Sequence, residues 1–224
     1  WRDWSSDVCS SDLSTFDGDN NPSEVMVDDI CIVNPEGNWH LYNHGHLELT
    51  KNCDEQYLDF WDFPEEKIDS ALIIGGGDYQ LISKLVPLKH CKVDLVDPNS
   101  YLYIDFHKFY LKENFNYCYN HVLPIYKKFS IFLYNYLDVQ TPKVYDLVCI
   151  DISEPLLGIT DEIYCEDFFI NLKKIKAKIY MMYMPPTVYD KLVPILRQNF
   201  TMISSKGDFV NDWNEQCDII TFIK

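Results

Sequence analysis

Several acidic and glycine residues could do chemistry, because each group directly follows a short apolar run. These groups are Gly75–Asp78 in "ALIIGGGD", Asp97 in "KVDLVD", and Asp151 with Glu154 in "YDLVCIDISEP". Carboxylates bind ammonium groups, and a carboxylate withdrawn from water gains the basicity to remove a proton. The sequence therefore contains the parts of a site for a cationic amine, provided that the fold brings these loops together.

The glycine turn leaves two interpretations open. Glycine adopts positive φ and lets a ligand approach the backbone, so Gly75, Gly76 and Gly77 form either a sharp corner or a cradle for a cofactor. The dinucleotide pattern G-x-G-x-x-G fails at Gln80 and does not decide between them. Asp78 caps the helix that follows or faces the ammonium group of a ligand.

The acids of the other two loops also allow two interpretations each. Asp97 lies where dinucleotide-binding folds place an acid that accepts hydrogen bonds from ribose hydroxyls, but it also precedes Pro98 and suits an Asx turn. Asp151 and Glu154 are placed to hold a cation or accept a proton, whereas loop acids without such a role are common. These residues alone do not choose between the alternatives.

The elements that must position these loops follow from the apolar pattern. Short runs rich in Val and Ile predict strands at 70–74, 92–97, 145–152, 177–184 and 218–223. Segments with helical spacing lie between them, for example Tyr164, Phe168 and Leu172. This alternation predicts an α/β, Rossmann-like fold in which a mainly parallel sheet carries helices on both faces and binds ligands at the carboxyl ends of its strands.

The N-terminal part of the chain has a different pattern. Residues 25–50 alternate between apolar and polar types around Pro and Gly turns, which predicts β-hairpins. A helix is expected over 54–63, ended by Pro64. We therefore expect a small β-hairpin domain over 14–60 and the Rossmann-like domain over 61–224. Residues 1–13, "WRDWSSDVCSSDL", lack the features of a signal peptide and resemble a translated library adapter, so they are treated as non-native.

Composition narrows the classes of partner. The chain has 224 residues with 35 acids against 19 Lys and Arg, a net charge of -16 that repels nucleic acid and anionic membranes and attracts cations. Its eight cysteines form no CxxC pair, which predicts reduced thiols and a cytoplasmic location. The histidines His40, His44 and His46 lack metal-site spacing, so no metal is expected. No apolar run approaches the roughly 20 residues of a membrane span.

Taken in order, "LIIGGGD", "YDLVCIDISEP" and "EIYCEDFF" resemble the spermidine synthase family, whose corresponding blocks read I-G-G-G-D-G, D-S-S-D-P and L-Y-T-x-E-F-Y. Upstream, "DDICIV" and "GHLELTKNCDEQYLDF" are similar to further stretches of that family, so the resemblance covers roughly 25–224. It implies a fold shared with S-adenosylmethionine-dependent methyltransferases. It also implies that Gly75, Gly76 and Gly77 line the site of the co-substrate, decarboxylated S-adenosylmethionine.

The resemblance implies roles for individual residues. Asp151 falls on the acid that deprotonates the attacking amine, and Glu154 on the acid that holds the amine acceptor. Asp78 matches the acid that grips the amino end of the co-substrate. Tyr57 matches a tyrosine that shapes the polyamine pocket, and Trp213 stands near a substrate-lining tyrosine of the family.

Some positions depart from the family's pattern. Tyr79 replaces the glycine after the acid, and Leu95 falls on the ribose-binding Glu, for which Asp97 is the candidate substitute. The family's adenine-contacting Asp-Gly pair has no counterpart around Leu133, and Glu48 falls on a substrate-binding Gln. Nucleoside recognition is therefore expected to differ more than recognition of the amine.

The leading hypothesis is transfer of an aminopropyl group from decarboxylated S-adenosylmethionine to putrescine, giving spermidine and methylthioadenosine without a metal or further cofactor. The resemblance also implies a homodimer. One alternative is a polyamine-binding or inactive homologue. The other is an S-adenosylmethionine-dependent methyltransferase, because the fold is shared and fold does not fix function.

Overall fold

The computed structural model describes residues 24–27, 30–33, 40–43, 46–50, 54–98, 100, 107, 114–138, 142–152, 164–210 and 216–224. The chain divides into two units, residues 1–52 and 53–224. Each unit is described by itself.

The N-terminal unit contains a four-stranded sheet. Its strands are β1 (Glu24–Val27), β2 (Ile30–Val33), β3 (His40–Asn43) and β4 (His46–Thr50). They pair in chain order, each antiparallel to the next, so that Val25 lies opposite Ile32 and Ile32 opposite Leu41. This sheet is the small N-terminal β-domain that the alternation predicts.

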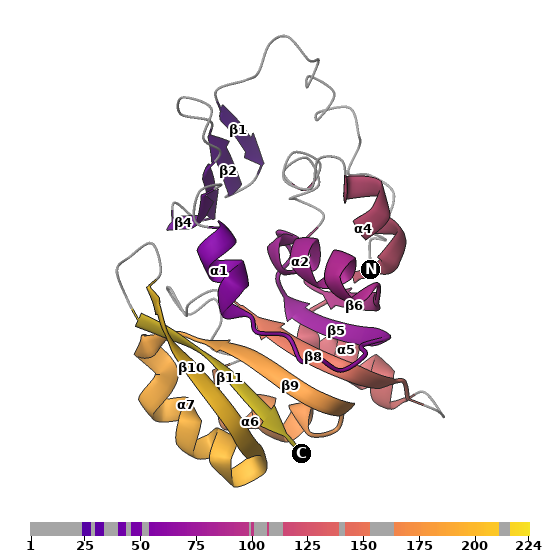
Figure 1. The fold of residues 1–224 in the computed structure, drawn as a ribbon, viewed down its shortest axis with the longest axis vertical. Helices are drawn as coiled ribbons and strands as arrows, with labels where there is room; N and C mark the ends of the chain where they lie inside the picture. The colour runs from indigo at the N-terminus through magenta and orange to yellow at the C-terminus, as the bar shows by residue number, and fades with distance from the viewer. Residues whose placement is uncertain are drawn as a thin grey trace. The chain divides into compact units, whose positions relative to one another are not determined.

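The second unit is built on a seven-stranded mixed sheet in the order β10-β11-β9-β8-β5-β6-β7. Its strands are β5 (Ser70–Gly75), β6 (Lys92–Val96), β7 (Val122–Ile125), β8 (Val144–Asp151), β9 (Lys176–Met184), β10 (Thr201–Val210) and β11 (Gln216–Ile223). Strands β5 to β9 pair in parallel, and β11 and β10 continue the sheet antiparallel (Figure 1). This is a Rossmann-like α/β fold, as predicted.

Helices cover both faces of this sheet. They are α1 (Asp54–Phe60), α2 (Gln80–Lys89), α4 (Phe115–His121), α5 (Phe129–Leu137), α6 (Glu166–Leu172) and α7 (Pro186–Asn199). Residues of α1, α2 and α4 pack into the core on one face, and residues of α5, α6 and α7 pack into the core on the other. Figure 1 shows α7 and α6 beside β9 to β11, and α2 beside β5 and β6.

The local sequence explains why β5 lies at the centre of the sheet. Its residues Ala71 to Ile74 are all fully buried, as expected for a strand covered on both faces. Strand β5 pairs with β6 on one side and β8 on the other, and Gly75 lies opposite Asp151. The loops that follow these three strands therefore meet at one edge of the sheet.

The structure differs from the prediction at α1, which ends at Phe60 rather than continuing to Pro64. Short turns follow, in which the amide of Asp62 donates to the carbonyl of Phe60 and the amide of Phe63 donates to the carbonyl of Trp61. The two units meet between residues 52 and 53, so α1 belongs to the second unit. The reason is that Phe60 and Trp61 are buried in the core beside α2.

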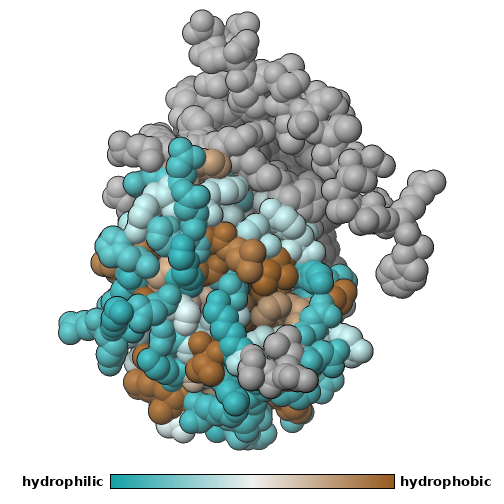
Figure 2. Space-filling view, turned by 90° about the vertical axis from the view of Figure 1, so that its right-hand side faces the viewer, coloured by the Kyte–Doolittle hydropathy of each residue, from teal (hydrophilic) through white to brown (hydrophobic). Residues whose placement is uncertain are grey.

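One face of the second unit is mostly polar. Figure 2 shows a face on which hydrophilic residues predominate and hydrophobic residues form small groups between them. Within the described ranges, no helix has the length and apolar character needed to cross a membrane.

Candidate active site

The glycine turn after β5 gives clearance to the acids of the neighbouring loops. Gly75 and Gly76 have positive φ values of 80° and 63°, which glycine adopts without strain. A Cβ on Gly75 would lie 2.0 Å from the carbonyl oxygen of Asp151, and a Cβ on Gly77 would lie 2.6 Å from Cγ of Asp97. The turn is therefore a sharp corner, and the absence of side chains on its glycines lets Asp97 and Asp151 pack against it.

Asp78 follows these glycines and lies two residues before α2, which begins at Gln80. Its Oδ1 accepts a hydrogen bond at 3.0 Å from the amide of Gln80, the first residue of α2, although the N-cap position itself is held by Tyr79. Withdrawal from water raises the pKa of Asp78 to about 6; the Gln80 amide opposes this rise and the charge of Asp97 adds to it. The amide of Asp78 itself also favours the charged form of this carboxylate.

Asp151 ends β8 and faces α1. The hydroxyl of Tyr57 donates a hydrogen bond to Oδ1 of Asp151, a contact that joins residues 94 positions apart. Withdrawal from water, and next the charge of Asp78, raise the pKa of Asp151 to about 7, while the hydrogen bond from Tyr57 opposes the rise. Asp151 is thus a carboxylate whose basicity suits proton transfer near neutral pH.

Asp97 completes the group of acids, which we call the acid cluster: Asp78, Asp97 and Asp151. Its carboxyl lies beside Gly77, and its charge acts on both other acids. In the described part of the chain, neither Asp78 nor Asp151 forms an ion pair with a Lys, Arg or His. Those residues also contain no group of three or more His, Cys, Asp and Glu arranged to hold a metal ion.

Two aromatic residues that the sequence did not single out enclose Tyr57. Its ring meets those of Trp61 and Tyr183 edge to face, with centroids 6.2 Å and 6.0 Å apart. The hydroxyl of Tyr183 lies 3.0 Å from the sulfur of Cys217. These contacts join α1, β9 and β11, and no local sequence pattern connects them. Only the position of Tyr183 at the carboxyl end of a predicted strand could have marked it.

Tyr79, the first departure from the family pattern, lies on the side of the turn that faces α4. It has a φ of 71°, is 2% exposed, and stacks on Tyr119 with ring centroids 5.0 Å apart. His107, which sequence reasoning also missed, lies 4.0 Å from the Tyr79 ring and 2.5 Å from the carbonyl oxygen of Gly77 through Nε2. Burial lowers the pKa of His107 to about 3, so the imidazole is neutral and its Nε2–H donates to Gly77.

The other departures lie in apolar packing. Leu95 is fully buried in β6, between Ile73 of β5 and Pro124 of β7. Leu133 is 5% exposed in α5 and packs into the core on the opposite face from α2. Neither side chain offers a polar group to a nucleoside.

Three predicted site residues cannot be placed at the acid cluster. Glu154 and Trp213 lie outside the described residues. Glu48 lies in β4 of the N-terminal unit, and its side chain is outside the described part. The structure thus brings together Asp78, Asp97, Asp151, Tyr57 and the glycine turn.

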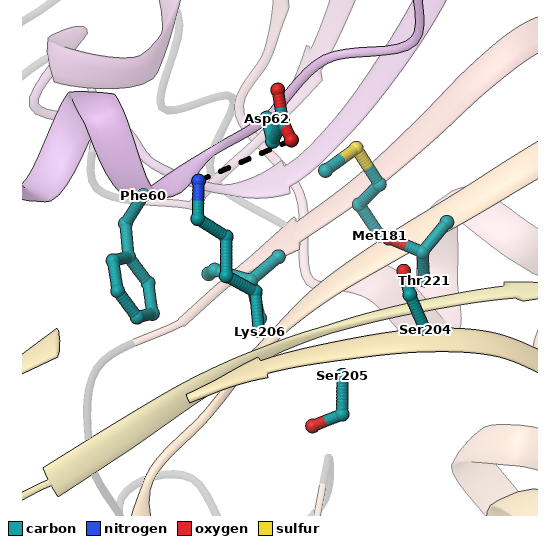
Figure 3. A pocket seen from close by; sticks show the side chains of 8 residues that line it. Phe60, Asp62, Met181, Ser204, Ser205, Lys206 and Thr221 are labelled. Carbon is teal, nitrogen blue, oxygen red and sulfur yellow. Dashed lines mark ion pairs between the residues drawn. The ribbon is translucent and has the colours of Figure 1, made fainter. Parts of the chain in front are cut away.

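A separate cavity of about 280 Å³ lies over β9, β11 and β10, on the sheet face that α1, α2 and α4 cover (Figure 3). Its lining residues are Phe60, Asp62, Met181, Ser204, Ser205, Lys206, Ile219 and Thr221. Lys206 extends toward Asp62, with Nζ 4.0 Å from the carboxylate. None of the acid cluster lines this cavity, so the two are distinct features.

Comparison with known proteins shows the fold. A spermidine synthase in complex with the transition-state analogue AdoDATO superposes with a TM-score of 0.69 at 13% sequence identity, covering 90% of this chain and 72% of the other. Spermidine synthase from Thermotoga maritima matches equally well, covering 89% and 71%. The N-methyltransferase NodS from Bradyrhizobium japonicum, in complex with S-adenosyl-L-homocysteine, has a TM-score of 0.52 at 16% identity, covering 78% and 86%. No family's sequence profile and no curated protein sequence matches the chain.

At such low identity these likenesses establish a shared architecture. The chain has the Rossmann-like fold of the two spermidine synthases and of the N-methyltransferase. Because one fold carries many activities, the reaction must be argued from the acid cluster and its neighbours.

Proposed function

We propose that this protein is an aminopropyltransferase that makes spermidine from putrescine and decarboxylated S-adenosylmethionine. The observation that carries the proposal is the hydrogen bond from Tyr57 to Asp151, beside the second raised-pKa acid Asp78. This pairing suits an amine acceptor, which needs both a counter-charge and a base. The likeness to two spermidine synthase structures supports a transferase on this fold.

The chemistry explains why such residues are needed. An alkyl amine has a pKa near that of Lys, about 10.4, so it is protonated at neutral pH and cannot attack carbon. Asp151 takes one proton from the ammonium, and the freed nitrogen lone pair forms a bond to the methylene carbon beside the sulfonium. The carbon–sulfur bond breaks, and its electron pair remains on sulfur as neutral methylthioadenosine. Alignment of nitrogen, carbon and sulfur supplies much of the rate.

The remaining residues take roles around this step. We assign Asp78 to the amino end of decarboxylated S-adenosylmethionine and Asp97, beside Gly77, to its ribose hydroxyls. Glu154 and Trp213 keep their predicted roles at the amine. A cytoplasmic homodimer is part of the same proposal, and light scattering after size exclusion measures the oligomeric state.

A second candidate is a homologue that binds polyamines without turnover. The specific observation in its favour is Leu95, a buried apolar residue at the position where the family places its ribose-binding acid. In this candidate the acid cluster still attracts the diammonium, but the co-substrate is not held.

One assay separates the candidates. The full chain is incubated with putrescine and decarboxylated S-adenosylmethionine, and methylthioadenosine and spermidine are quantified by mass spectrometry. We expect both products in equal amounts. Absence of both, with putrescine binding retained in calorimetry, would favour the binding homologue. S-adenosylhomocysteine formed from S-adenosylmethionine and an amine would instead identify a methyltransferase.

A further inference from the structure

Trp61 contains an unusual buried donor. Its side chain is fully buried, and its Nε1 is the one buried side-chain nitrogen or oxygen without a hydrogen-bond partner among the residues that the structure describes. Buried polar groups are nearly always paired, so an exception requires a physical explanation.

The surroundings of Trp61 supply one. Its ring meets Tyr57 edge to face at 6.2 Å, with an angle of 76° between the planes. Tyr57 in turn packs against Tyr183 at 6.0 Å, so its ring is held between two others while its hydroxyl donates to Asp151. Burial raises the pKa of Tyr57, and the charge of Asp151 adds to this; the Trp61 indole acts in the opposite direction, as a donor to the Tyr57 oxygen does.

We propose that Trp61 is a positioning residue, whose N–H closes on the Tyr57 oxygen and holds that hydroxyl as a donor to Asp151. This role rests on the proposed function, in which Asp151 removes the amine proton. With the indole on its lone pair, the Tyr57 hydroxyl keeps its hydrogen directed at the carboxylate. Without the indole, the Tyr57 oxygen loses the donor that opposes its accepting a hydrogen from protonated Asp151, an arrangement that stabilises the protonated form of the base.

The groups that face Asp151 make this donor important. Asp78 from the glycine turn, Asp97 from the end of β6 and Cys149 from β8 are acids or thiols, and Tyr183 from β9 faces Tyr57. The acids disfavour a charged Asp151. Among the described groups that act on Asp151, the Tyr57 hydroxyl is the one that favours the ionised form, so any loss of its orientation acts on the proton affinity of Asp151.

The test is the titration of Asp151 in Trp61→Phe, followed by NMR of carbon-13-labelled Asp carboxyls without substrate. We expect the Asp151 pKa to rise by about half a unit or more, roughly threefold in proton affinity. In a Tyr57→Phe background, Trp61→Phe should cause no further rise in the Asp151 pKa, because the hydroxyl through which Trp61 acts is already absent. Phe63→Leu is the matched control: Phe63 packs 6.3 Å from the Trp61 ring and carries no donor, so Asp151 should titrate as in the unmodified chain.

A second measurement keeps the inference testable if Trp61→Phe does not fold. In the unmodified chain, the indole nitrogen-15 resonance of Trp61 should shift as Asp151 titrates, and this dependence should vanish in Tyr57→Phe. The inference is overturned if the pKa of Asp151 is unchanged in Trp61→Phe, or if it rises equally in Phe63→Leu. It is also overturned if the indole resonance of Trp61 does not shift as Asp151 titrates. Because neither titration contains substrate, failure of the transferase assay leaves both results interpretable.

Discussion

The hydroxyl of Tyr57 in α1 donates a hydrogen bond to the carboxylate of Asp151 at the end of β8. Because Asp151 also packs against Gly75 and Gly76, a single carboxylate joins the helix, the central strand and its glycine turn. Its pKa is raised by withdrawal from water and by Asp78, and lowered by Tyr57, so its basicity depends on the contacts of several elements.

Asp151→Asn should remove turnover while preserving the fold. The amide keeps the size of the carboxyl and still accepts a hydrogen bond from Tyr57, but it cannot take a proton from the amine. We expect kcat to fall by about a hundredfold or more, as for loss of a general base. The measurement is methylthioadenosine release in steady state. Asp59→Asn, which changes an exposed acid of α1, serves as the control and should retain activity. Undiminished turnover in Asp151→Asn would contradict the assignment of the base.

The acid cluster should make stability fall as the pH rises. The folded-state pKa values of Asp78 and Asp151 are raised, to about 6 and about 7, so the folded chain binds protons more tightly than the unfolded chain. The destabilisation is absent below pH 4, grows between about pH 4 and 7, and is complete above that window. Asp151→Asn should therefore raise the free energy of unfolding at pH 8 by on the order of 2 kcal/mol, and by much less at pH 4.

The control for this pH dependence is Asp146, an acid whose pKa is shifted in the opposite direction. A hydrogen bond from Lys178 is the main cause that lowers the pKa of Asp146 to about 2, so its contribution is present above about pH 4 and lost toward pH 2. Asp146→Asn should accordingly destabilise the chain at pH 8. Urea unfolding at both pH values measures both variants. Destabilisation by Asp151→Asn at pH 8 would show that the carboxylate supports the fold instead of straining it.

The strands that position the site could be predicted because a short apolar run in the local sequence marks each buried strand. Strands β5, β6, β8, β9 and β11 are runs of Val, Ile and other apolar residues, and each was expected within two residues of its observed bounds. Strand β10 was missed because its outer residues are polar: Ser204, Ser205 and Lys206 are exposed, and no apolar run marks the strand.

The candidate site divides in the same way. Asp78, Asp97 and Asp151 could be expected together, since each follows a strand and the carboxyl ends of parallel strands share one edge. Trp61, Tyr183 and His107 could not, because their contacts join distant parts of the chain through side-chain packing. The sequence marked Tyr79 as a departure from the family's glycine but could not show that its ring stacks on Tyr119.

The glycine turn should tolerate substitution unequally. Gly75→Ala places a Cβ 2.0 Å from a backbone oxygen, so no side-chain movement relieves the contact. The positive φ of Gly75 adds backbone strain to this clash. We expect little folded protein from this variant. Gly77→Ala instead meets the carboxyl of Asp97, a side chain that rotates away. This variant should fold, with a raised KM for decarboxylated S-adenosylmethionine and little change in putrescine affinity. A larger effect on putrescine than on the nucleoside would place Asp97 on the amine side.

Putrescine binding should release protons near neutral pH. A diammonium ion favours the ionised form of Asp78 and Asp151, so binding lowers their raised pKa values and frees the protons that they hold. The release should be largest between about pH 6 and 7 and should vanish above pH 8, where both carboxyls are already ionised. Calorimetric titration in phosphate and in imidazole, whose ionisation heats differ, counts the protons directly. In Asp151→Asn the release should shrink to the share of Asp78, and proton uptake at pH 6.5 would exclude the acid cluster as the amine site.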